Sequence, residues 1–234
     1  MIETAVALLL AHVLADFTAQ TGWMVRHKVR AEVFALHIAI TGALSWAALG
    51  FYGWQAALAV TAAHAGIDAL KTWALPLAWR NTLATFLSDQ AAHIVSIAAV
   101  ALIWPGAAAS GLWAPWLAQL TAPALTIAGI VLCVWAGGHA VGLLMQRYAA
   151  EALPEGLPDA GRLIGQLERA MIFLLVLINQ PAGIGFLIAA KSILRFDTAS
   201  KGQKTGEYVI IGTLASFAWA LAIATATQRL LAGL

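Results

Sequence analysis

Eight apolar segments separated by short breaks limit most strongly what this chain can fold into. Most of them are about 20 residues long, the length at which an α-helix crosses the hydrocarbon core of a bilayer. Charged side chains make up 10% of the 234 residues, compared with about a quarter in soluble domains. We therefore predict an all-α, polytopic transmembrane bundle with about eight spans. The predicted helices cover residues 2–22, 32–52, 54–75, 81–104, 123–147, 163–180, 182–197 and 207–231.

The order of these segments suggests two halves within one integral membrane domain. We expect a first half at 1–104, a loop at 105–122 and a second half at 123–234. The loop contains Gly, Pro and two Trp but no charged residue, which predicts an interfacial or re-entrant segment. The single cysteine, Cys133, excludes a disulfide framework. A net charge of +2 gives no indication of nucleic-acid binding.

Basic residues indicate the orientation in the membrane. Lys and Arg follow the first predicted helix, precede the fourth, end the fifth and lie between the seventh and eighth, whereas the intervening connections have none. Only Arg229, at the tail, breaks this alternation. Because cytoplasmic loops carry the excess of Lys and Arg, we predict that both termini lie in the periplasm or outside the cell.

Histidine and aspartate residues lie inside the first four predicted helices. Three pairs have a spacing of four residues, which places both members on one helical face. The predicted topology brings all of these residues to a similar depth, so we expect them to converge. The set comprises His12 and Asp16, His37, His64 and Asp68, and Asp89 and His93.

A repeat of 52 residues relates the first two predicted helices to the next two. The shift carries His12 to His64, Asp16 to Asp68, and His37 to Asp89. The strings HVLAD and HAGID show the match. Two hairpins of the same orientation predict a parallel tandem repeat, in which related half-sites face each other.

Seven ionisable residues inside a membrane require a compensating interaction, because each costs about 2.5–3.5 kcal/mol at a helix centre on insertion scales. Imidazole and carboxylate are ligands of Zn, Fe and Mn. We therefore predict a divalent metal site of one or two ions made by the seven residues, with Asp16, Asp68 or Asp89 also available as a catalytic base. Polar contacts between helices and a proton relay are the alternatives. Lys71, at the border of the set, is expected to snorkel to the interface.

The second half carries basic residues at the predicted cytoplasmic edge. Such residues bind phosphate head groups of lipids, although the positive-inside rule alone also accounts for most of them. The candidate substrate-binding residues are Arg169, Lys191, Ser192 and Arg195.

Several strings together resemble a known family. The segments are HVLADFTAQTGWMVRHK, HAGIDALK, DQAAH, GRLIGQLER, AAKSILRF and EYVIIGT. They resemble the bacterial integral membrane family catalogued as domain of unknown function 3307, over nearly the whole chain. The resemblance implies a bacterial inner (cytoplasmic) membrane protein and implies no chemistry.

The residues favour a metal-dependent membrane hydrolase acting on a lipid or lipid-linked substrate with an anionic head group. In this hypothesis the bound ion lowers the pKa of its water toward neutrality, and the second-half basic residues hold the anionic group. The alternative is a transporter or channel for a divalent metal or for protons that uses the same residues. A third possibility is a structural subunit in which the polar residues only fix helix packing.

Overall fold

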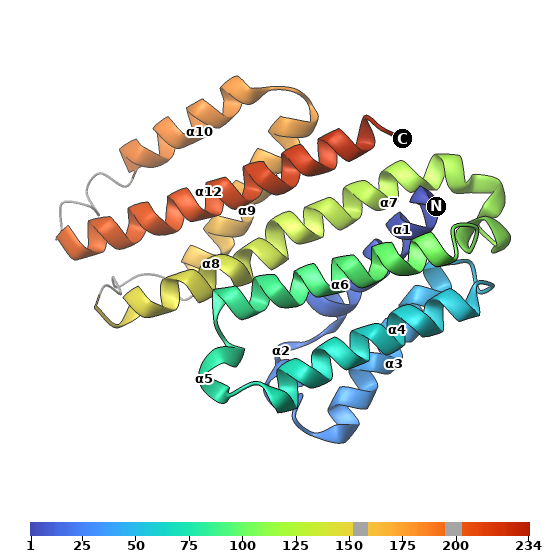
Figure 1. Ribbon diagram of the computed structural model, residues 1–234. Helices are drawn as coiled ribbons and strands as arrows, with labels where there is room; N and C mark the ends of the chain where they lie inside the picture. Colours follow the sequence, from blue (N-terminus) through green and yellow to red (C-terminus); the bar gives the residue numbers. More distant parts are fainter. Residues whose placement is uncertain (152–158, 195–202) are drawn as a thin grey trace. The chain divides into compact units, whose positions relative to one another are not determined.

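The computed structural model describes residues 1–151, 159–194 and 203–234. These residues form helices and turns without a β-strand (Figure 1). Five helices are long and apolar enough to span a membrane, and their bounds are Ile2–Ala19, Ala31–Ala48, Leu83–Ile103, Ala114–Tyr148 and Lys204–Leu231. The predicted all-α, membrane-type fold is confirmed. The count of eight spans and the side on which the termini lie stay predictions.

The chain forms two compact units, residues 1–128 and residues 129–233. The helix α7 (Leu117–Val131) contains the boundary between them. This helix begins six residues before the start of the predicted helix at 123. Residues 117–122 contain no Gly or Pro, and Thr121 Oγ1 donates a hydrogen bond to the Leu117 carbonyl at 2.6 Å. The helix therefore extends into the segment predicted as a loop.

Unit 1 is built around four long helices. Helix α1 contacts α3 and α6, and α4 contacts the same two, so the four form a closed ring. Threonine side chains cap two of the helices: Thr21 Oγ1 accepts from the Met24 N–H at the start of α2, and Thr82 Oγ1 accepts from the Thr85 N–H at the start of α6. The elements are α1 (Ile2–Leu14), η1 (Ala15–Ala19), α2 (Gly22–His27), α3 (Ala31–Ala48), α4 (Trp54–Ala69), η2 (Leu70–Ala74), α5 (Leu77–Arg80) and α6 (Leu83–Ile103).

The tandem repeat is visible in the element order. Helix α1 begins at Ile2 and α4 at Trp54, while α3 begins at Ala31 and α6 at Leu83, so both pairs are 52 residues apart. Each copy runs from a long helix through a π-helical turn (η1 or η2) and a short helix to a second long helix. The 52-residue shift thus relates local structure as well as sequence.

An apolar core closes one end of unit 1. It includes Leu8, Leu49, Val60 and Ile97, all at most 5% exposed. Two short 3₁₀ turns, η3 (Ala108–Ser110) and η4 (Ala114–Trp116), lie in the connection that follows α6.

Hydrogen bonds tie this connection to the helix ends. Thr4 Oγ1 donates to the Pro105 carbonyl at 2.9 Å, and the Leu112 N–H donates to the Gly50 carbonyl at 2.9 Å. Gly50 has a φ of +70°, and a Cβ at Gly111 would collide with the Leu49 carbonyl. Both positions therefore require glycine, and the connection packs against the helices as a fixed cap.

Unit 2 has its own core, made by the segments that follow the boundary. Its largest buried side chains include Ile172, Phe173 and Phe217. Helix α12 contacts α8, α9 and η5. The elements are η5 (Leu132–Ala136), α8 (Gly137–Met145), η6 (Gln146–Glu151), α9 (Ala160–Leu177), α10 (Pro181–Leu194) and α12 (Gln203–Leu231).

Candidate metal centre

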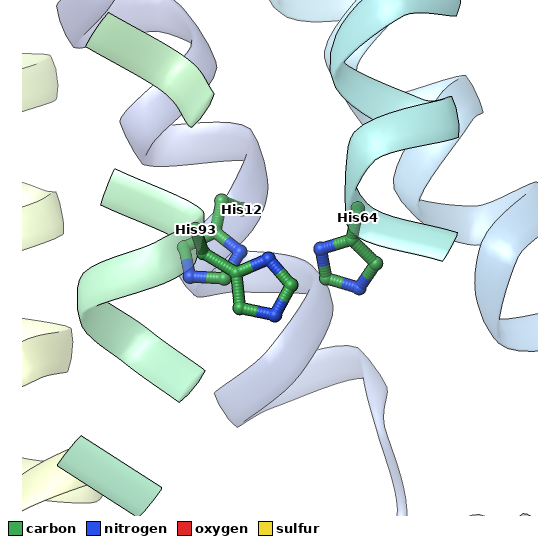
Figure 2. Close-up of side chains that lie close together, drawn as sticks. All are labelled: His12, His64 and His93. Carbon is green, nitrogen blue, oxygen red and sulfur yellow. The ribbon is translucent and has the colours of Figure 1, made fainter. Parts of the chain in front are cut away.

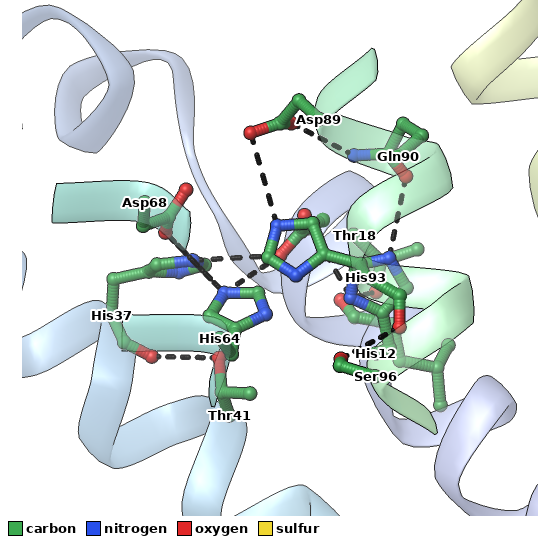
Figure 3. Close-up of polar contacts among 12 residues, drawn as sticks. His12, Thr18, His37, Thr41, His64, Asp68, Asp89, Gln90, His93 and Ser96 are labelled. Carbon is green, nitrogen blue, oxygen red and sulfur yellow. Dashed lines mark hydrogen bonds and ion pairs between the residues drawn. The ribbon is translucent and has the colours of Figure 1, made fainter. Parts of the chain in front are cut away.

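The seven predicted ligand residues lie together in unit 1, where the faces of the four long helices meet (Figure 3). Six of them are buried, and Asp16 is partly exposed. Each helix contributes at least one residue, so the ring of helices itself brings the side chains together. Helix α1 with η1 contributes His12 and Asp16, α3 contributes His37, α4 contributes His64 and Asp68, and α6 contributes Asp89 and His93.

Four ligand-type atoms lie close together in this cluster. The Nε2 atoms of His37 and His64 are 3.0 Å apart. The Oδ1 atom of Asp16 is 3.4 Å and 3.5 Å from these two nitrogens, and Oδ2 of Asp68 is 3.2 Å and 3.3 Å from them. Figure 3 shows the contacts of the two imidazoles with Asp68. We call these four atoms the N₂O₂ set.

The N₂O₂ set has more contacts than hydrogens to fill them. An imidazole Nε2 carries at most one hydrogen whatever its charge, and an ionised carboxylate carries none. At most two of the five measured contacts can therefore be ordinary hydrogen bonds. In the remaining contacts, lone pairs of two atoms point toward each other and repel. A bound cation would turn this repulsion into attraction, because each lone pair would then face a positive charge.

Five of the six separations within the N₂O₂ set lie near the ligand-to-ligand distance around a tetrahedral ion. Ligand distances of about 2.0–2.1 Å around zinc give ligand-to-ligand separations of about 3.3 Å in a tetrahedron. The five measured separations run from 3.0 to 3.5 Å. Two imidazole nitrogens and two carboxylate oxygens are a donor set that zinc accepts.

Two further groups of possible ligands overlap this set. One consists of His12, His64 and His93, whose rings face one another in Figure 2. The other consists of Asp68, Asp89 and His93. In each group, one ligand atom per residue lies within 4.8 Å of the others. The cluster therefore offers ligands for a second ion.

Several buried atoms of the cluster make no hydrogen bond of normal geometry to the described part of the chain. Unpaired polar atoms are rare inside proteins, and each one calls for a partner such as water or an ion. The six atoms are His12 Nδ1, Asp16 Oδ1, His37 Nδ1, Asp68 Oδ2, Asp89 Oδ1 and His93 Nε2.

Two lysines pair with the cluster. Lys28 Nζ lies 2.7 Å from Asp68 Oδ2, and Lys71 Nζ lies 3.0 Å from Asp89 Oδ2. Their side chains are 19% and 28% exposed. The sequence led us to expect that Lys71 would snorkel to the interface. In the structure its ammonium group pairs with Asp89 instead. Gln90 also joins the cluster, because its Oε1 lies 3.3 Å from His12 Nε2.

A small cavity of about 10 Å³ adjoins the three facing histidines. This is roughly the volume that one water molecule requires. Hydroxyl groups line part of it and apolar side chains of the closed end line the rest. The lining residues are His12, Thr41, Ser45, His64, His93, Ser96, Leu8, Val60 and Ile97.

The two π-helical turns lie beside the aspartates of the repeat. Turn η1 contains Asp16, and η2 begins two residues after Asp68. Such turns occur frequently at functional sites, since the extra residue re-aims neighbouring side chains. Neither turn contains Gly or Pro, so no signal in the sequence predicted the two π-helical turns.

Three of the four predicted substrate-binding residues are among the described residues, and these three belong to unit 2 and have local partners. Arg169 is 3% exposed and donates to the Val134 carbonyl at 2.9 and 3.2 Å and to Ser216 Oγ at 3.0 Å. Lys191 Nζ pairs with Glu168 at 2.5 Å, and exposed Ser192 donates to its own helix. Arg195 lies outside the described residues. Binding of an anionic head group by these residues stays a prediction.

The buried bonds of Arg169 predict a structural role that a substitution can test. We expect Arg169→Gln to lower the free energy of unfolding by about 2 kcal/mol or more, because buried acceptors lose their donors, with no change in metal content. Thermal unfolding and elemental analysis would measure the two effects. Arg162→Gln, at an exposed position of the same helix, is the matched control. Unchanged stability with lost substrate binding would instead support the predicted binding role.

Comparisons with known proteins add a family assignment. Residues 4–119 match the family described as "Protein of unknown function (DUF3307)". The match includes all seven cluster residues, whereas GRLIGQLER, AAKSILRF and EYVIIGT lie outside it. No curated protein and no solved structure matches the chain. The resemblance to the DUF3307 family that the sequence predicted is therefore confirmed over residues 4–119, just under half of the chain.

Proposed function

We propose that this protein is a metal-dependent membrane hydrolase that acts on a lipid or lipid-linked substrate with an anionic head group. The observation that carries the proposal is the N₂O₂ set, in which five contacts between four ligand atoms measure 3.0–3.5 Å. The two imidazole nitrogens carry too few hydrogens to make all five contacts hydrogen bonds. Zinc fits this set best, while iron and manganese share its ligand types.

In this proposal, Asp16, His37, His64 and Asp68 hold a divalent ion. The ion would supply Lewis acidity by admitting water as a further ligand and lowering the pKa of that water. Asp89 is the candidate general base, because its Oδ1 is buried and has no hydrogen-bond partner among the described residues. Lys71 and Gln90 hold its other oxygen at 3.0 and 3.2 Å, which orients the carboxylate.

One-sided access supports an enzyme. Two partly exposed lysines border the cluster, Lys28 at Asp68 of the N₂O₂ set and Lys71 at Asp89. The buried core around Leu8, Val60 and Ile97 closes the other side. A closed far side suits a reaction in which substrate enters and product leaves by one opening. The predicted topology directs that opening to the cytoplasmic face of a bacterial inner membrane.

Transport of a divalent metal is the second candidate, and the π-helical turns η1 and η2 favour it. Irregular helical backbone beside buried ligands is common at the ion sites of secondary transporters. The apolar core at the closed end opposes it. Uptake of zinc into proteoliposomes would distinguish the two functions, because an enzyme gives no flux.

The test of the proposed function begins with protein purified in detergent without chelator. We expect elemental analysis to find one or two divalent ions per chain. We also expect slow hydrolysis of a phosphate, carboxylate ester or amide lipid probe that stops on chelation and returns on adding zinc. His64→Ala should lose both properties, whereas His27→Ala, outside the cluster, should keep them. Absence of bound metal, or a metal-loaded protein inactive on all three probe classes, would contradict the proposal.

A further inference from the structure

The two lysines that pair with the cluster point to a binding site for an anion. Lys28 and Lys71 each place an ammonium group on a carboxylate that belongs to a possible ligand group, Asp68 and Asp89 respectively. Both lysines come from the connections between long helices. Lys28 follows α2 and Lys71 lies in η2.

Lys28 and a metal ion require the same atom. The Oδ2 of Asp68 that lies 2.7 Å from Lys28 Nζ is also the oxygen of the N₂O₂ set. A divalent ion at that oxygen repels the nearby ammonium, and in a partly buried site this repulsion is weakly screened. Metal binding therefore weakens the hold of Asp68 on Lys28.

Metal binding also reverses the net charge of the site. Three aspartates and two lysines with neutral histidines have a net charge of −1, and one divalent ion changes this to +1. A second ion raises it further. A partly buried site with net positive charge binds an anion to restore neutrality.

Phosphate suits the groups that are then available. It carries up to two negative charges and presents several acceptor oxygens to a metal ion and to ammonium groups at once. The lysine side chains are partly exposed, so an incoming phosphate can reach them from the open side of unit 1.

We propose that Lys28 and Lys71 form a phosphate-binding site that becomes available when metal occupies the N₂O₂ set. This inference rests on the proposed metal site and adds the substrate class, a phosphate ester. The same chemistry is presented by a phospholipid head group and by a phosphate in solution.

Calorimetry on the full-length protein in detergent tests the proposal, with zinc content measured in every sample. We expect the zinc-loaded protein to bind inorganic phosphate at least tenfold more tightly than the chelator-treated protein. The double variant K28Q/K71Q should keep its zinc and lose at least tenfold in phosphate affinity. The matched control R26Q/R30Q removes two exposed basic residues of the same segment and should bind phosphate like the wild type.

A second measurement separates competition from a merely structural role of Lys28. Because the ammonium competes with the ion for Asp68, K28Q is expected to bind zinc several-fold more tightly. A lysine that only stabilised the fold would give equal or weaker zinc binding.

The outcomes distinguish the two proposals. Wild-type protein without zinc would overturn both. Zinc-loaded protein whose phosphate affinity is unchanged by chelation or by K28Q/K71Q would overturn only the phosphate site. Binding to nanodiscs of phosphatidic acid and of phosphatidylcholine shows whether the bound phosphate belongs to a lipid head group or to a soluble molecule. Tighter binding to phosphatidic acid than to inorganic phosphate indicates a lipid head group, and the reverse indicates a soluble phosphate.

Discussion

Replacing His64 with alanine is expected to weaken zinc binding by at least about 100-fold. His64 contributes Nε2 to the N₂O₂ set and also belongs to the group with His12 and His93. Residues that only support a metal ligand already contribute about 10–100-fold to affinity, so loss of a ligand should exceed that range. Competition with a chromophoric chelator would measure the affinity.

His27→Ala is the matched control for this prediction. His27 lies in α2, where its ring packs on Trp23 and its Nδ1 contacts the Trp23 carbonyl at 2.8 Å. The variant removes an imidazole from the same unit without touching the cluster, so it should bind zinc like the wild type. Equal zinc affinity in His64→Ala and His27→Ala would show that the cluster is held together by contacts between side chains alone.

Removal of metal is expected to destabilise unit 1 selectively. A ligand that binds only the folded state stabilises it by about 2.7 kcal/mol at 100 times its Kd and by about 4.1 kcal/mol at 1,000 times its Kd. The cluster joins α1, α3, α4 and α6, so the effect should extend to all four helices. Hydrogen exchange of the chelated protein in these helices should then be faster by up to about 1,000-fold.

Unit 2 provides the internal reference for that experiment. Its core around Ile172 and Phe217 contains none of the cluster residues, so exchange in α9 should change little. His64→Ala should show fast exchange in unit 1 whether or not zinc is added. Equal exchange of wild-type unit 1 with and without metal would rule out a bound ion that links the four helices.

The gathering of the seven cluster residues could be predicted because it depends on regular spacing. Pairs four residues apart share a helical face, and the 52-residue shift sets the two hairpins in register. The structure brings His12 and Asp16 together with their repeat partners His64 and Asp68. The alternation of basic and non-basic connections predicted the topology. That topology placed the seven residues at a similar depth, so their convergence could be expected.

Other features depend on contacts that no local pattern encodes. The pairing of Lys71 with Asp89 joins η2 to α6, and a lysine near a predicted interface has no sequence signal that separates pairing from snorkelling. The π-helical turns contain no Gly or Pro, so they are set by packing. Arg169 resembled a head-group ligand in sequence because its acceptors, Val134 and Ser216, lie 35 and 47 residues away.

The ligand-type residues of the two hairpins differ at two aligned positions of their second helices. The first helices, α1 and α4, carry the same His and Asp, whereas His37 and Thr41 on α3 correspond to Asp89 and His93 on α6. Two identical hairpins would enclose a site with twofold symmetry, in which both sides bind alike. Exchange of ligand types at two positions breaks that symmetry. The first hairpin thereby contributes an imidazole to the N₂O₂ set, and the second contributes Asp89, the candidate base, and His93.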